Sequence, residues 1–173
     1  TRTFANAWLV WRLGGFQLDH PDLAVRLTTD GRLVDLHGGE ADIAIRAGLG
    51  SWDGLDSEPL MPIDYTPMGA PTLIRRVEAK LGRPMRPSDL PDLPLISPED
   101  EWLDHWLEER GVGTAGRSRR GGLRLDSQAD EANAAMAGQG FAMLTPTFWA
   151  KDLADGRLVQ PFPETTQGRF GYY

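Results

Sequence analysis

Hydrophobic spacing alternates between helical and strand periods along the first part of the chain, and this order constrains the fold most strongly. Apolar residues recur at helical spacing from Ala5 to His20, where His20-Pro21-Asp22 ends the pattern. Leu23 to Thr28 alternates apolar and polar residues, as a half-buried strand does. A helix over Gly31 to Gly39 and a strand over Ala41 to Ala47 follow. Because the connections are short, this order predicts an α/β fold with parallel strands joined by crossover helices.

The rest of the chain continues the mixture of helix and strand, with irregular stretches rich in glycine or proline at Gly48 to Pro59 and Arg83 to Pro94. Helices are predicted over Thr72 to Leu81, around Trp102 to Leu107, from Asp126 or Ser127 to Ala137, and from Phe148 to Leu153. Extended segments are predicted over Leu60 to Gly69, Leu95 to Ser97, Leu123 to Leu125, Gly138 to Pro146, Arg157 to Phe162 and Gly168 to Tyr173.

Composition narrows the class of protein. A chain of 173 residues with 40% hydrophobic content can bury a core, as one domain or as two small lobes. The absence of cysteine excludes disulfides, cysteine-ligated metals and thiol nucleophiles. No apolar run is long enough to cross a bilayer and no signal peptide is recognisable, so we expect a cytoplasmic protein without a membrane partner.

The charge balance bears on nucleic-acid binding. The net charge is −7, from 18 Lys and Arg against 25 Asp and Glu, whereas DNA binding ordinarily needs a cationic face. One basic cluster, Arg117, Arg119 and Arg120, is flanked by glycines and is interpreted as a surface loop, with phosphate contact as the alternative. We therefore expect no DNA contact from these residues.

Enzymatic motifs are missing from the sequence. His20, His37 and His105 are far apart and form no metal-ligand pair, and no nucleophile elbow, phosphate loop or dinucleotide-binding turn is present. We expect no catalytic residues, no metal and no cofactor.

Three long segments resemble a known family in the same order. They are TFANAWLVWRLGGFQLDHPDLAVRL, GRLVDLHGGEADIAIRAGLGSWDGLDSEPL and LRLDSQADEANAAMAGQGFAMLTPTFWAKDLADGRLVQPF. Together they resemble the effector-binding domain of bacterial LysR-type transcriptional regulators, in the style of the glycine-cleavage-activator subgroup.

The resemblance implies a type 2 periplasmic-binding-protein fold, in which two crossing strands join two α/β lobes around a ligand cleft. The first lobe would take residues 1–66 and 146–173, and the second lobe residues 67–145. DNA would be bound only by an N-terminal winged helix-turn-helix that is absent from this chain. A solute-binding protein for transport shares this fold and remains the alternative. The hinge is expected at Thr66, Pro67, Leu144 and Thr145.

Ligand contacts are expected where helices begin, because unpaired backbone N–H groups there attract anions and polar ligands. The hydroxyl groups of Thr3, Thr29 and Ser127 stand at three such positions, with simple helix capping as the alternative for each. Arg46 ends a predicted strand and is the candidate for a carboxylate contact, although an outward surface arginine fits equally. The full expected set is Thr3, Phe4, Thr29, Arg46, Trp52, Tyr65, Met68, Ser97, Ser127 and Thr145.

The resemblance also implies partners. A small-molecule effector would shift a population of lobe arrangements and so signal to the DNA-binding part. A homodimer or tetramer would place Ala7 to Gln17 and Leu23 to Thr28 of one chain against Glu131 to Met136 of another. Apolar residues such as Leu9 or Val10, if exposed on the first helix, would favour this interface.

Overall fold

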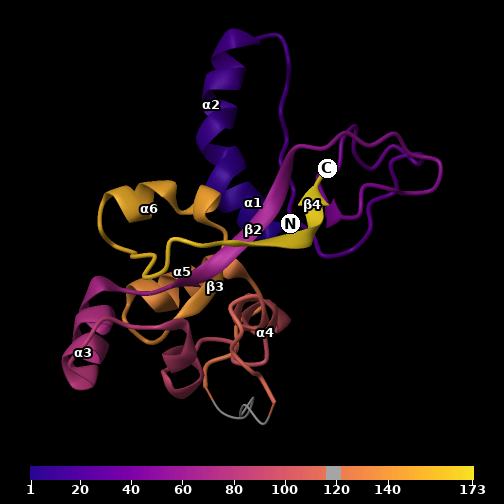
Figure 1. Cartoon of the computed structure of the whole chain (residues 1–173). Helices are drawn as coiled ribbons and strands as arrows, with labels where there is room; N and C mark the ends of the chain where they lie inside the picture. The colour runs from indigo at the N-terminus through magenta and orange to yellow at the C-terminus, as the bar shows by residue number, and fades with distance from the viewer. Residues whose placement is uncertain (116–121) are drawn as a thin grey trace. The chain divides into compact units, whose positions relative to one another are not determined.

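The chain forms two compact units in a computed structural model that describes residues 1–115 and 122–173 (Figure 1). Unit 1 comprises Thr1–Ile63 and Arg169–Tyr173, and unit 2 comprises Asp64–Gly168. The chain passes into unit 2 within strand β2 (Met61–Met68) and returns to unit 1 within strand β4 (Thr166–Tyr172). Two strands therefore carry the chain between the units.

Unit 1 begins with a continuous helical stretch. Helix α1 (Arg2–Phe4) runs through a π-helical turn at Ala5–Leu9 into helix α2 (Val10–Asp19). The helix predicted from Ala5 to His20 is thus confirmed, and it ends before Pro21 as expected. Helix α2 buries none of its residues within the described chain. Its apolar side chains are therefore left for solvent or for a partner.

The strand predicted over Leu23 to Thr28 and the helix predicted over Gly31 to Gly39 are wrong. The first segment is exposed and pairs with no strand among the described residues, and alternation alone cannot supply the hydrogen bonds that a strand needs. In the second, side chains replace helical bonds: Asp35 Oδ1 accepts from the Gly38 N–H at 2.8 Å, and Glu40 Oε2 accepts from the Asp35 N–H at 3.0 Å.

Strand pairing is antiparallel, so the predicted parallel arrangement is wrong for the named strands. Strand β1 (Ala47–Gly48) pairs with β4, and β2 pairs with β3 (Ala142–Leu144). Of the strand predicted over 41–47, only Ala47 lies in a strand. The strand order is β1-β4-β2-β3. Parallel pairing among the described residues is limited to two single bridges, Leu95 with Phe141 and Ile96 with Leu123. The strands predicted at 95–97 and 123–125 form only these bridges.

The helices predicted for the remainder of the chain are confirmed within a few residues. Proline at the first position starts α3, and Gly82, with a φ of +68°, ends it in the left-handed conformation that glycine tolerates. Ser127 caps α5 as predicted. The helical segments of unit 2 are α3 (Pro71–Leu81), a 3-10 turn at Pro87–Asp92, α4 (Glu101–Glu108), α5 (Gln128–Met136), a 3-10 turn at Pro146–Phe148, and α6 (Ala150–Ala154).

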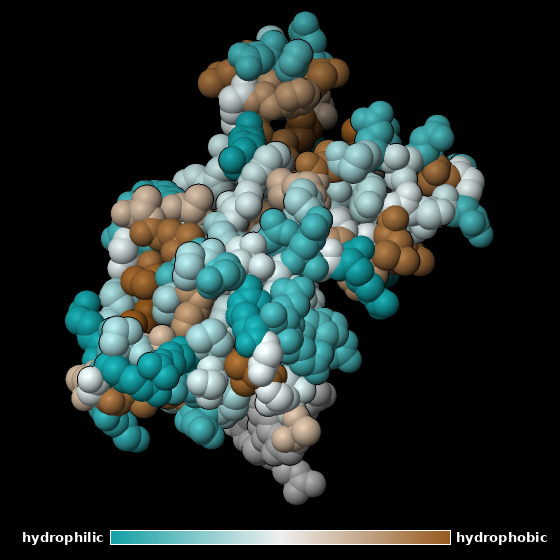
Figure 2. Space-filling view, in the orientation of Figure 1, coloured by the Kyte–Doolittle hydropathy of each residue, from teal (hydrophilic) through white to brown (hydrophobic). Residues whose placement is uncertain are grey.

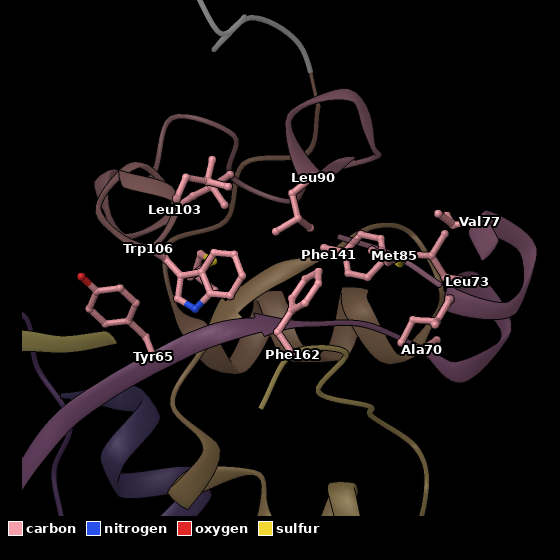
Figure 3. Packing of buried hydrophobic residues seen from close by; sticks show 13 residues of the cluster. Tyr65, Ala70, Leu73, Val77, Met85, Leu90, Leu103, Trp106, Phe141 and Phe162 are labelled. Carbon is pink, nitrogen blue, oxygen red and sulfur yellow. The ribbon is translucent and has the colours of Figure 1, made fainter. Parts of the chain in front are cut away.

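The main hydrophobic core lies in unit 2, around the fully buried indole of Trp106 (Figure 3). The Tyr65 ring stacks on Trp102, with centroids 4.5 Å apart and an interplanar angle of 9°. Phe162 tilts against Trp106 at 5.1 Å. The apolar face of α3 supplies Leu73 and Val77, which are buried in the same cluster. Trp106 therefore belongs to the core, and the partly buried Trp102 packs against it.

Hydrogen bonds tie the segment before β4 to this core. The Glu164 carbonyl accepts from Thr66 Oγ1 at 3.0 Å and from Trp106 Nε1 at 3.3 Å. Arg110 donates to Thr166 Oγ1 at 3.0 Å and to the Thr165 carbonyl at 3.2 Å. These bonds hold residues 164–166 within unit 2, which takes residues 64–168, whereas the resemblance implies a first lobe that includes 146–173.

Unit 2 buries three acidic residues, Asp104, Glu131 and Asp152, and the pKa of Glu131 is raised. Glu131 of α5 is 7% exposed and its carboxyl is hydrogen-bonded to the Ser97 hydroxyl. Burial raises the pKa of Glu131 to about 7, and the nearby charges of Asp100, Glu99 and Asp130 act in the same direction. The Glu131 carboxyl therefore changes its charge near neutral pH.

Replacing Trp106 by alanine should lower the free energy of unfolding by about 3–5 kcal/mol, because it empties the centre of the core. The control is Leu49→Ala, at a leucine that is 69% exposed, and it should change stability by no more than about 0.5 kcal/mol. Urea unfolding followed by circular dichroism measures both. Equal losses in the two variants would contradict the placement of Trp106 at the centre of the core.

The buried Glu131 carboxyl should make stability depend on pH. Between its ordinary pKa of 4.5 and about 7, the unfolded chain releases a proton that the folded chain keeps, so the Glu131 contribution to stability falls as pH rises through this window. Glu131→Gln should remove this slope. Between pH 4 and pH 8, the free energy of unfolding of the variant should therefore rise relative to that of the unchanged protein by up to about 3 kcal/mol. Exposed Glu164→Gln is the control. Parallel pH profiles for Glu131→Gln and the unchanged protein would contradict the assignment.

Candidate functional site

A pocket of about 350 Å³ lies within unit 1. Its volume is at the lower end of the range for small-molecule sites, and its wall is mainly apolar. Arg46 and Trp52, two of the expected ligand-binding residues, both line it. The structure therefore brings these two side chains to one cavity. The remaining lining residues include Leu33, Leu36, Ile43, Leu55, Leu60 and Tyr173.

Two aromatic rings build one side of the pocket. The Trp52 ring meets the Tyr173 ring edge-on, with centroids 5.9 Å apart. A Cβ on Gly48 would lie 2.8 Å from the Trp52 ring, and a Cβ on Gly50 would overlap the Tyr173 ring. Gly50 also has a φ of +84°, which other residues rarely adopt. The glycine-rich loop thus makes room for the aromatic wall.

Arg46 is held by its backbone and by one side-chain bond. Its N–H donates to the Tyr173 carbonyl and its carbonyl accepts from the Tyr173 N–H, both at 3.0 Å. The guanidinium donates from Nη1 to the Arg32 carbonyl at 2.9 Å in an exposed hydrogen bond. Asp56 and Glu58 also line the pocket but are exposed, and neither forms an ion pair with Arg46 in the described part of the chain.

A second group of expected residues gathers at the first turn of α5 in unit 2. Ser127 Oγ accepts from the Asp130 N–H at 3.3 Å and donates to the Asp130 carboxylate at 2.7 Å. The Gln128 side chain bonds both the Thr145 N–H, at 3.0 Å, and Thr145 Oγ1, at 3.3 Å. Ser127 therefore performs the capping role that was its alternative interpretation, and Thr145 is held at the end of β3.

Ser97 joins this group through Glu131. Its backbone has a φ of +48°, a left-handed conformation uncommon for a residue with a side chain. Its hydroxyl accepts from the Leu125 N–H at 3.3 Å and bonds the Glu131 carboxyl. Non-glycine residues in this conformation cluster at functional sites. The backbone of Ser97 therefore makes this part of unit 2 a candidate site.

The other expected ligand residues lie elsewhere. Phe4 is buried in unit 1 between the rings of Trp8 and Tyr172, at 5.1 and 4.9 Å. Thr3 is also buried, whereas Thr29 is exposed in a segment without regular structure, because the strand and helix expected around it do not form. In unit 2, Met68 and Tyr65 are buried core residues.

The expected hinge residues all belong to unit 2. Thr66 lies opposite Leu144, and Pro67 lies opposite Met143, in the antiparallel pairing of β2 with β3. The chain crosses between the units at Ile63–Asp64 and at Gly168–Arg169 instead. The hinge at Thr66, Pro67, Leu144 and Thr145 stays a prediction.

Sequence reasoning missed several pocket and site residues. Tyr173 lines the pocket and pairs with Arg46, but a contact across most of the chain leaves no local pattern. Gln128 was expected only as part of the cap at 126–128, and Glu131 only as part of the partner interface from Glu131 to Met136. The polar residues of a helix's first turn are a signal that could have pointed to them.

Three further features of the sequence are the basic cluster, possible metal ligands and possible membrane-spanning helices. The basic cluster Arg117, Arg119 and Arg120 lies outside the described residues. Within 1–115 and 122–173, no three His, Cys, Asp or Glu side chains are arranged to hold a metal ion. No helix in the same ranges combines the length and apolarity needed to cross a membrane.

Comparison with known proteins gives a consistent result. The model of the LysR substrate binding domain matches residues 1–173. The HTH-type transcriptional activator AmpR of Rhodobacter capsulatus is 34% identical over 97% of this chain and 55% of its own length. The glycine cleavage system transcriptional activator of Escherichia coli K12 is 28% identical over 99% of this chain and 54% of its own length. This chain thus spans about half the length of these relatives.

A solved structure agrees with these sequence matches. The effector domain of the transcriptional regulator AmpR of Pseudomonas aeruginosa superimposes with a TM-score of 0.79 at 29% identity, covering 98% of this chain and 78% of that chain. The two-unit chain thus has the periplasmic-binding-protein-like α/β fold of LysR effector-binding domains. With the family model matched from the first residue to the last, the chain belongs to the LysR substrate-binding domain family.

Proposed function

We propose that this chain is the effector-sensing part of a bacterial LysR-type transcriptional regulator. The observation that carries the proposal is the family match over residues 1–173, and the similarity to an effector domain supports it. The relatives reported above are named as transcriptional activators, which favours a regulator over a transport protein or an enzyme. A cytoplasmic location belongs to the same proposal.

In this proposal the first turn of α5 contributes to binding of a small metabolite. Its N-terminal N–H groups favour a carboxylate or another polar acceptor, and Ser97, Ser127 and Thr145 are all bonded to the helix within its first turn or at its cap. The metabolite acts by binding one arrangement of the protein more tightly than another, which shifts a population already present. DNA is bound by a separate N-terminal part, because this chain carries a net charge of −7.

We propose that α2 and the segment after it form an interface between two copies of the chain. Val10, Trp11 and Leu18 are 50%, 75% and 84% exposed, and Leu23, Val25 and Leu27 are exposed beyond the helix. Figure 2 shows hydrophobic side chains at the surface over α2. So many exposed apolar side chains on α2 and the segment after it are typical of a surface that another protein covers. The contribution expected from Glu131 to Met136 is smaller, because Ala132 and Ala135 are fully buried in unit 2.

The sensing role predicts a ligand-dependent thermal shift. In a screen of amino acids, short carboxylates and aromatic acids against the complete protein, at least one compound should raise Tm. Ser127→Gly should reduce this shift strongly, because it removes the hydroxyl while costing only a few tenths of a kcal/mol as a helix cap. Full response to the ligand in this variant would leave Ser127 with a capping role alone, and the absence of any responding compound would count against a sensor.

The interface predicts that charge on α2 weakens self-association. Val10→Glu and Trp11→Glu should each shift the complete protein toward a smaller species in sedimentation experiments, because a carboxylate would be buried without a partner. Leu81→Glu, at an exposed leucine at the end of α3, is the matched control and should leave the mass unchanged. An unchanged mass in all three variants would place the interface elsewhere.

A further inference from the structure

Beyond the proposed effector contact at α5, we propose that the unit 1 pocket is a second ligand site, for a monocarboxylate with an aliphatic or aromatic body. Every residue that lines it belongs to unit 1, whereas the residues gathered at α5 belong to unit 2. The two sites share no residue. One can therefore fail without the other.

The apolar body of the ligand is specified by the wall of the pocket. Leu33, Ile43 and Leu55 line it together with the rings of Trp52 and Tyr173. Ile43 is 81% exposed and Leu33 is 71% exposed, although both face a common cavity. Covering these side chains with an apolar chain or ring removes their contact with water, which is the main source of affinity in such pockets.

The carboxylate is specified by Arg46. A guanidinium has five N–H donors, and the only side-chain hydrogen bond of Arg46 within the described residues is the one to the Arg32 carbonyl. Arg46 is a partly buried residue that lines the pocket beside apolar side chains, and its guanidinium has no carboxylate partner in the described chain. A ligand carboxylate would supply the missing counter-charge through a bidentate pair, and Trp52 beside it would cover the ligand body.

The acidic residues at the pocket restrict the ligand to one negative charge. Asp56 and Glu58 line the cavity and are exposed. A single ligand carboxylate would be paired with Arg46, whereas a second carboxylate would have no cation to pair with and would be repelled by these two side chains. Their neutralisation should therefore tighten anion binding, whereas loss of Arg46 should weaken it. Opposite responses to these two changes are the signature of this site.

Octanoate is a suitable probe, with the complete protein observed through its ¹³C-labelled isoleucine methyl groups. Octanoate should shift the methyl signals of Ile43 and Ile45, which line the pocket, and leave those of Ile74 and Ile96 in unit 2 unchanged. Octanamide, which has the same body without the charge, should bind at least about tenfold more weakly. An absence of binding at millimolar octanoate, shifts confined to unit 2, or equal binding of octanamide would each overturn the proposal.

Variants test the charged partner. Arg46→Gln should weaken octanoate binding about tenfold or more, and Arg46→Lys should weaken it less, because the charge remains while the bidentate geometry is lost. Arg169→Gln is the matched control at an exposed arginine of the same unit, outside the pocket. The double variant Asp56→Asn, Glu58→Gln should bind octanoate a few-fold more tightly. Equal affinity in Arg46→Gln and Arg169→Gln would overturn the pairing even if octanoate binds.

Discussion

The Glu164 carbonyl oxygen is the point on which the organisation of unit 2 depends, because it accepts hydrogen bonds from both Thr66 Oγ1 and Trp106 Nε1. The first donor belongs to β2, and the second belongs to the helix at the centre of the core. Arg110 extends the same cluster: its guanidinium lies 3.9 Å from the Trp106 ring centroid and bonds Thr165 and Thr166. The two segments that lead to and from unit 1 are thereby fixed to one buried indole.

The two units differ in how completely they bury their apolar residues. Unit 2 buries Trp106, Leu90 and Leu107 completely, whereas α2 of unit 1 buries nothing and the pocket exposes Leu33 and Ile43. Surplus apolar surface of this kind is typical of binding surfaces. It is the common physical basis of the proposed interface and of the proposed pocket ligand, which use different residues of unit 1.

Several polar residues at the expected site have a structural role in the described chain. Ser127 caps α5, Gln128 holds Thr145, and Ser97 bonds both Leu125 and Glu131. Such bonds fix the positions of the side chains around the first turn of α5. A pre-positioned polar edge loses little freedom when a ligand binds, which is consistent with the sensing role proposed for it.

The sequence by itself determined the helices of unit 2, the Ser127 cap and the extended course of β2, because periodicity, proline at a helix start and glycine at a helix end act over a few residues. It also determined the family, through three long matches in order. Only the tertiary structure decided that Leu23 to Thr28 is not a strand, that the pairings are antiparallel, and that Arg46 and Trp52 share a pocket with Tyr173. Those features depend on which distant segment supplies the hydrogen-bond partner or the facing side chain, and local spacing carries no information about that choice.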